Sequence, residues 1–143
     1  MEMDTQDFEI IDLEVNMPPT LNKAYINTKK GRRLTTHAKK TKESITKLVS
    51  FYILKKDINM SLYKDNQMTL TVDYYFKEVE NKGWPKKAKF RYKKVDISNR
   101  IKLLEDAIAD AIGIGDENFF KLVLTKHKSE NRQEKCRIRI KVE

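Results

Sequence analysis

Acidic, amide and basic side chains gather between Val95 and Glu117, and this segment holds the residues best suited to chemistry. If its first part is helical, a rotation of about 100° per residue places Asn99, Lys102 and Asp106 within a sector roughly 60° wide. Oxygen ligands suit hard cations such as Mg²⁺, and an ammonium group can stabilise negative charge that develops in a reaction. The spacing therefore indicates one polar face on which metal-assisted chemistry could take place.

Two further carboxylates flank that polar face. Asp96 stands just before the expected helix and Asp116 just after it, so a full helix length separates them along the chain. Spacing alone does not bring them together, because that requires neighbouring strands to fold back against the helix.

These residues also have ordinary structural interpretations. Asp96 or Ser98 could cap the helix, and Lys102 could pair with the acid four residues later for about 0.2–0.5 kcal/mol. Asp116 lies in a Gly-Asp-Glu-Asn run that is typical of a turn. From the residues alone, the structural and the chemical interpretations both stay open.

The alternation of apolar residues predicts the strands that would position this segment. Strict alternation from Met68 to Phe76 predicts a half-buried strand. Similar patterns predict strands over 8–15, 120–124 and 136–142, and a short extended piece over 90–95. The last two long strands are expected to form a two-stranded hairpin at the end of the chain.

Helical spacing of apolar residues predicts two helices. The first begins after a cap at Thr35 or Thr36 and reaches about Lys55. The second carries an apolar stripe from Ile97 and ends near Gly113, where glycine can supply a left-handed cap. The order of elements predicts an α+β fold, with a mixed sheet of about four to five strands and helices on one face.

The chain has 143 residues and no internal repeats, low-complexity tracts or linker, so a single domain over residues 1–143 is expected. Only Cys136 is present, which excludes an intramolecular disulfide and a cysteine-rich zinc site. No run approaches the roughly 20 apolar residues that span a bilayer, and the start lacks a signal-peptide pattern. These features predict a cytoplasmic protein that does not enter a membrane.

Basic residues exceed acidic ones by 30 to 21, and the formal net charge of +9 favours a polyanionic partner such as nucleic acid. One cluster of cations interleaves with Phe90 and Tyr92 directly before Asp96. It consists of Lys86, Lys87, Lys89, Arg91, Lys93 and Lys94. The cluster suits contact with DNA phosphates, although lysines on an exposed edge strand would give the same pattern.

Two motifs in this sequence resemble those of the RusA-type Holliday junction resolvases. That family carries an Asp-x-Asp-Asn-x-x-Lys-x-x-x-Asp segment at the start of a helix. The residues that match it at its spacing are Asp96, Asn99, Lys102 and Asp106. The family also begins with a strand that runs into Pro-Pro-x-x-Asn, which residues 18–22 reproduce. The resemblance covers most of the chain and implies a single RusA-like endonuclease domain.

The resemblance implies roles for residues of the motif. Asp96 and Asp116 are expected to bind a divalent metal, Mg²⁺ or alternatively Mn²⁺, while Lys102 assists catalysis and Asp106 supports it. A bound metal lowers the pKa of its water and neutralises charge on the transition state, which suits phosphodiester hydrolysis. Contacts with DNA are expected from Asn99 and the basic cluster.

The sequence departs from the family at two positions. Ser98 stands where the second motif Asp usually lies, and Gly115 stands where the first Asp of a paired-Asp turn commonly lies. Ser98 would take the place of that acid among the catalytic residues, but a hydroxyl is a weaker ligand. Asn22 is expected to contact DNA, or to stabilise its own loop by bonding the backbone.

The implied function is a metal-dependent, structure-selective endodeoxyribonuclease that resolves Holliday junctions or related branched DNA. Resolution of a four-way junction needs symmetric cuts, so a homodimer with identical sites is expected. One alternative is a non-catalytic nucleic-acid-binding protein derived from the same fold, which the two lost acids favour. Another is a nuclease that prefers flaps or replication forks.

Overall fold

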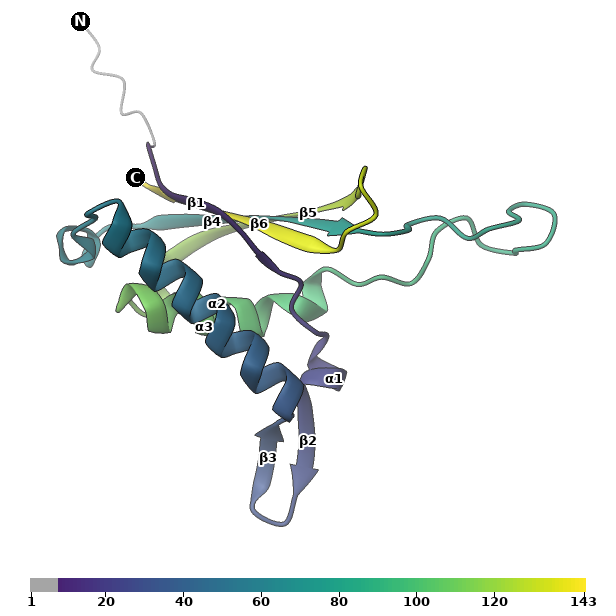
Figure 1. The fold of residues 1–143 in the computed structure, drawn as a ribbon, viewed down its shortest axis with the longest axis horizontal. Coiled ribbons are helices and arrows are strands. Elements are labelled where there is room, and N and C mark those ends of the chain that lie inside the picture. Colours follow the sequence, from purple (N-terminus) through teal and green to yellow (C-terminus); the bar gives the residue numbers. More distant parts are fainter. Residues whose placement is uncertain (1–7) are drawn as a thin grey trace, which may run out of the picture.

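The computed structural model describes residues 8–143, in which a sheet forms one layer and the helices form a second layer beneath it (Figure 1). The four strands of the sheet are β1 (Phe8–Asn16), β4 (Met68–Phe76), β5 (Phe119–Lys128) and β6 (Lys135–Val142). Their order is β1-β6-β4-β5, with β6 antiparallel to both neighbours and β4 parallel to β5. The sheet is therefore mixed, as the sequence predicts.

The predicted helices are α2 (Thr36–Lys55) and α3 (Ile101–Ile112), which cover the same face of the sheet (Figure 1). Thr35 caps α2, because its hydroxyl oxygen accepts a hydrogen bond of 3.2 Å from the Ala38 amide. Gly113 ends α3 with a left-handed φ of 70°. Shorter helical elements are α1 (Leu21–Ala24) and the 3-10 turns η1 (Met60–Tyr63), η2 (Ser98–Arg100) and η3 (Asp116–Asn118).

Alternate residues of the strands fill the core between the sheet and the helices. Ile138 and Ile140 of β6 are fully buried, as are Leu104 and Ile108 of α3, and they belong to one apolar cluster. At about 25 cal/mol per Å² of apolar area, this burial is what holds α3 in place. The core therefore fixes the helix that carries the sequence motif.

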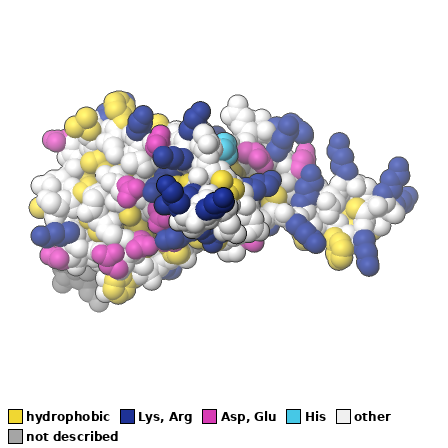
Figure 2. Space-filling view, turned by 90° about the horizontal axis from the view of Figure 1, so that it is seen from below, with side chains coloured by type: hydrophobic (Ala, Val, Ile, Leu, Met, Phe, Trp, Pro, Cys, Tyr) yellow, Lys and Arg dark blue, Asp and Glu magenta, His cyan; other side chains and the backbone are white. Residues whose placement is uncertain are grey.

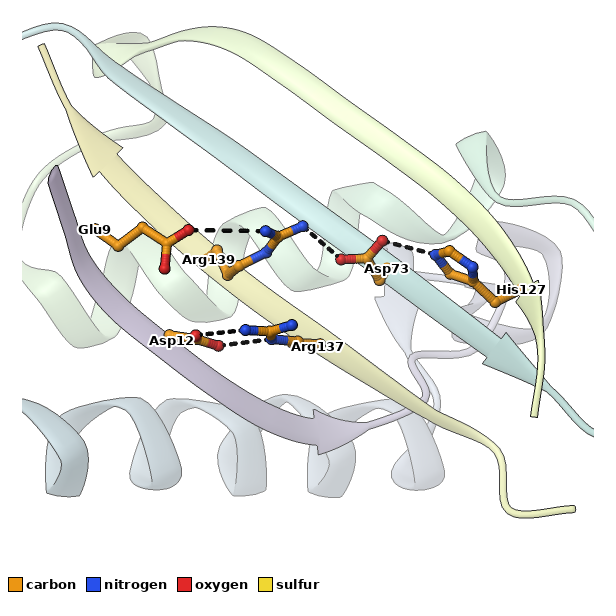
Figure 3. Close-up of polar contacts among 6 residues, drawn as sticks. All are labelled: Glu9, Asp12, Asp73, His127, Arg137 and Arg139. Atoms are coloured by element: carbon orange, nitrogen blue, oxygen red, sulfur yellow. Dashed lines mark hydrogen bonds and ion pairs between the residues drawn. The ribbon is translucent and has the colours of Figure 1, made fainter. Parts of the chain in front are cut away.

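Charged side chains cover the opposite face of the sheet (Figure 3). Arg137 binds Asp12 through two hydrogen bonds of 2.8 and 2.7 Å. The buried Asp73 accepts hydrogen-bond contacts of 2.8 Å from Arg139 and from the His127 ring. Ion pairs therefore cover this face of the sheet, whereas the helices cover the other face.

Two expectations about strands need correction, and one sheet was missed. The chain does not end in a two-stranded hairpin, because β4 lies between β5 and β6. Residues 90–95 form no strand and only a single bridge joins Tyr92 to Glu80. A separate two-stranded sheet, β2 (Tyr25–Thr28) with β3 (Gly31–Leu34), was not predicted. Alternation shows which side chains share a face, but it does not show which strands are neighbours.

Within residues 8–143, no helix has the length and apolar character that crossing a membrane requires.

Candidate active site

Asp96 organises the turn that leads into α3. Its Oδ1 accepts hydrogen bonds from the Ser98 hydroxyl at 2.8 Å, the Ser98 amide at 3.0 Å and the Asn99 amide at 3.3 Å. The hydrogen bond from the Ser98 hydroxyl is the main cause that holds the pKa of Asp96 below its ordinary value, and the charge of Lys126 also lowers it. Asp96 is therefore kept ionised on the exposed surface.

The same contacts realise the capping role that the sequence left open. Asp96 binds two backbone amides at the start of the helical segment, as a capping carboxylate does. All three hydrogen bonds involve Oδ1, and Oδ2 accepts none from residues 8–143. One carboxylate oxygen of Asp96 thus keeps its capacity to bind another group.

Arg100 joins the two sequence motifs. Its Nε donates to the Asp96 carbonyl at 3.1 Å, and its Nη1 donates to the Pro18 carbonyl at 2.8 Å. The guanidinium also lies over the Phe76 ring, with its carbon 5.2 Å from the ring centre. Arg100 therefore fastens the motif to the Pro-Pro loop and to the end of β4.

Lys102 lies on the polar face of α3 among carboxylates. Its Nζ is 3.1 Å from Oδ1 of Asp106, so the pairing expected from the sequence is present. The hydrogen bond to Asp106 raises the pKa of Lys102, and the charges of Asp116 and Glu105 raise it further. Lys102 is therefore an ammonium group paired with Asp106 and influenced by two further carboxylates.

Glu105 completes this group, although the sequence analysis did not select it. Burial is the first cause that raises its pKa, and the charge of Asp116 is the second. Glu105 stands three residues after Lys102, which places it about 60° from Lys102 around the helix. The helical spacing could therefore have identified it.

The turn that carries Asp116 is firmly attached. Asn118 donates from Nδ2 to the carbonyls of Lys64 at 2.6 Å and Asn66 at 3.0 Å. The Glu117 side chain folds back over Gly115, and its carboxylate fills the space that a side chain at position 115 would enter. An acid thus occupies that space even though Gly115 has replaced the family's Asp.

Asp116 and Asp96 act electrostatically on different residues. The charge that acts on Asp96 comes from Lys126 of β5, whereas Asp116 acts on Lys102 and Glu105. Among residues 8–143, no three His, Cys, Asp or Glu side chains are grouped so as to hold a metal ion. The available oxygen donors suit a hard cation, but the protein alone offers few of them in one place.

The basic cluster lies on a projection, here called the basic arm and defined as residues 77–95. Figure 1 shows it extending beyond the end of β4, and Figure 2 shows Lys and Arg side chains along it. All six cations of the cluster are exposed. Arg91 is 3.3 Å from Glu80 and packs over Trp84 at 5.1 Å, so it also stabilises the arm.

Asn22 and Asn99 are the remaining residues that the sequence placed in the site. Asn22 is exposed on α1, and its side chain forms no hydrogen bond within residues 8–143. Asn99 is half-buried in η2. Lys126, which acts on Asp96, comes from a strand far along the chain, and no sequence signal links it to the motif.

A family model described as Endodeoxyribonuclease RusA matches residues 16–143 of the chain. The search of curated protein sequences found no match to the chain. The matched range contains both sequence motifs, the basic arm and every candidate site residue.

Proposed function

Because the chain belongs to the RusA family of endodeoxyribonucleases, we propose that it is a metal-dependent, structure-selective nuclease that resolves Holliday junctions or related branched DNA. The observation that carries the proposal is the Asp96 carboxylate, which three hydrogen bonds hold at the turn into α3, followed on that helix by the exposed Lys102 ammonium. Such a combination suits an anionic substrate whose negative charge increases during reaction. The whole chain would act as a single domain.

Asp96 and Asp116 are the proposed metal ligands. When bound, Mg²⁺, or alternatively Mn²⁺, would supply an activated water and neutralise charge on the phosphate. Oδ2 of Asp96 and the Asp116 carboxylate make no hydrogen bond or ion pair within residues 8–143, which leaves them available. Because the protein provides few ligands, the remaining ones would come from water and a DNA phosphate.

The other site residues have roles that follow from their contacts. Ser98 lowers the pKa of Asp96 by hydrogen bonding, and Asp106 raises the pKa of Lys102 in the same way. The Lys102 ammonium would stabilise negative charge on the phosphate or on the leaving oxygen. Asn99 and Asn22 would contact the DNA backbone close to the site.

The wider assembly follows from the proposed task. The basic arm would bind backbone phosphates, because its cations are exposed and lie directly before Asp96. A homodimer would present two identical sites for the paired cuts that resolution needs. A DNA substrate and the absence of a second cysteine are consistent with action in the cytoplasm.

A specific observation favours a second candidate, a DNA-binding protein without nuclease activity. Ser98 and Gly115 replace two acids of the family's pattern, and residues 8–143 contain no grouped metal ligands. This candidate retains the basic surface and predicts binding without cleavage.

Cleavage of defined substrates distinguishes these functions. The protein is incubated with a synthetic four-way junction, a flap and a matched linear duplex, each with Mg²⁺, with Mn²⁺ and with EDTA. The proposal predicts metal-dependent cutting of the junction and little cutting of the duplex. Preferential cutting of the flap would indicate a different substrate, and binding without any cutting would support the second candidate.

A further inference from the structure

The hairpin formed by β2 and β3 projects away from both layers of the fold (Figure 1). Thr28 pairs with Gly31, so Lys29 and Lys30 form a two-residue turn at the tip. Thr28 closes the turn, because its hydroxyl donates to the Gly31 carbonyl at 2.7 Å. Strands of this length reach roughly 13 Å from the body of the protein.

The hairpin carries unpaired positive charge. Lys29, Lys30, Arg32 and Arg33 are all exposed, and Figure 2, which looks onto the tip, shows Lys and Arg side chains there. The sequence has no acidic residue from Val15 to Lys42. None of these four cations forms an ion pair within residues 8–143, unlike Arg91 of the basic arm.

The base of the hairpin is attached to the helix that carries the candidate site. Tyr25 and Leu34 pack on a small buried cluster of Ala24, Ala38 and Leu103. Leu103 directly follows Lys102 in α3, so the hairpin and Lys102 are held by the same helix. Arg32 lies over the Tyr25 ring at 4.6 Å, which adds to the rigidity of the hairpin.

We propose that the β2–β3 hairpin is a second DNA-binding element, which lies in the major groove of a duplex arm and contacts phosphates on both sides. The inference rests on the proposed action on branched DNA. A major groove about 12 Å wide admits a two-stranded ribbon. Unpaired cations at the tip and on β3 suit backbone phosphates, so the binding is independent of sequence. The basic arm and the hairpin then bind different parts of one branched substrate.

The proposal is tested by removing positive charges from the hairpin, with a control variant that loses the same number of charges elsewhere. The hairpin variant combines Lys29→Gln, Lys30→Gln and Arg33→Gln, and it keeps Arg32 because this residue packs on Tyr25. The control combines Lys55→Gln and Lys56→Gln at the other end of α2, roughly 30 Å away along the helix, with Lys64→Gln directly after η1. Binding to a four-way junction is measured in EDTA over a range of salt concentrations.

The hairpin variant is expected to bind the junction about tenfold more weakly and to release about 2–3 fewer counterions, which lowers the slope of log affinity against log salt. The control is expected to keep the affinity and slope of the unmodified protein. Equal behaviour of the two variants would overturn the proposal. Cleavage is assayed separately with Mg²⁺. If the unmodified protein does not cut but the hairpin variant still loses affinity, the proposed nuclease function fails and the hairpin proposal stands.

A cysteine at the tip gives a second measurement, which reports protection of the tip and not affinity. Cys136 is the only native cysteine and is fully buried, so Lys30→Cys provides a single reactive thiol. Saturating linear duplex is expected to slow its modification by a maleimide about tenfold. An unchanged rate at saturation would show that the tip does not lie in the groove.

Discussion

The Ser98 hydroxyl donates a hydrogen bond of 2.8 Å to Oδ1 of Asp96, so the residue that replaces an acid of the motif now stabilises the neighbouring acid. This contact is the first cause of the lowered pKa of Asp96. It gives Ser98 a role through Asp96, and substitutions at position 98 test that role in two ways.

Ser98→Ala is expected to raise the pKa of Asp96 towards its ordinary value, because the strongest hydrogen bond to the carboxylate is lost. Since the pKa in the folded protein is depressed, the stabilisation is present at neutral pH and is lost as pH falls through that pKa. NMR titration of the Asp96 carboxyl carbon measures the shift, with Ser50→Ala as control. An unchanged titration would remove Ser98 from this role.

Ser98→Asp is expected to lower the Mg²⁺ concentration that gives half-maximal junction cleavage, because it adds a carboxylate beside Asp96. Metal titrations of cleavage by the two proteins provide the comparison. If only the variant cuts, the natural protein is a binding protein that has lost nuclease activity. Failure of both folded proteins to cut any branched DNA would contradict the nuclease assignment.

Asp116→Asn is expected to abolish cleavage while junction affinity stays within about tenfold, because the carboxylate is proposed to bind metal and not DNA. Asp110→Asn is the matched control. Asp110 lies exposed on α3, where it pairs with Lys42 at 3.3 Å, and its loss should leave cleavage intact. Normal cutting by Asp116→Asn would exclude Asp116 from the site.

Asp73→Ala is expected to reduce the free energy of unfolding by about 1–3 kcal/mol, because Arg139 loses its closest acidic partner in a largely buried position. Asp12→Ala should cost only about 0–1 kcal/mol, since the pair with Arg137 is more exposed. The Asp73 side chain is 11% exposed and that of Asp12 is 34% exposed. Urea unfolding of both variants measures the difference, and equal losses would contradict this ranking.

The sequence predicted the elements whose patterns are local. The strand from Met68 to Phe76 and the helix that ends at Lys55 have the expected bounds, because alternation and capping act between near neighbours. The pairing of β4 with β5 was not predictable in this way. It depends on contacts between segments far apart in the sequence, and the pattern of either strand fits several neighbours.

In the candidate site, too, contacts within one helix could be predicted and contacts between distant segments could not. The contact between Lys102 and Asp106 follows from helix geometry, and so could the proximity of Glu105. The influence of Lys126 on Asp96 depends on β5 reaching the start of the motif, which requires the fold. The charged hairpin was missed because its strands are only four residues each and show no clear alternation.

The parallel pairing of β4 and β5 determines where the chain can change in length. Parallel neighbours require the chain to leave the sheet and return to the same end, and residues 77–118 make that excursion. The basic arm lies within it, outside every strand register and outside the core. Doubling the length of a flexible loop costs only about 0.6 kcal/mol, so arms of different length are compatible with one scaffold. The length of the arm can thus change while the sheet stays the same.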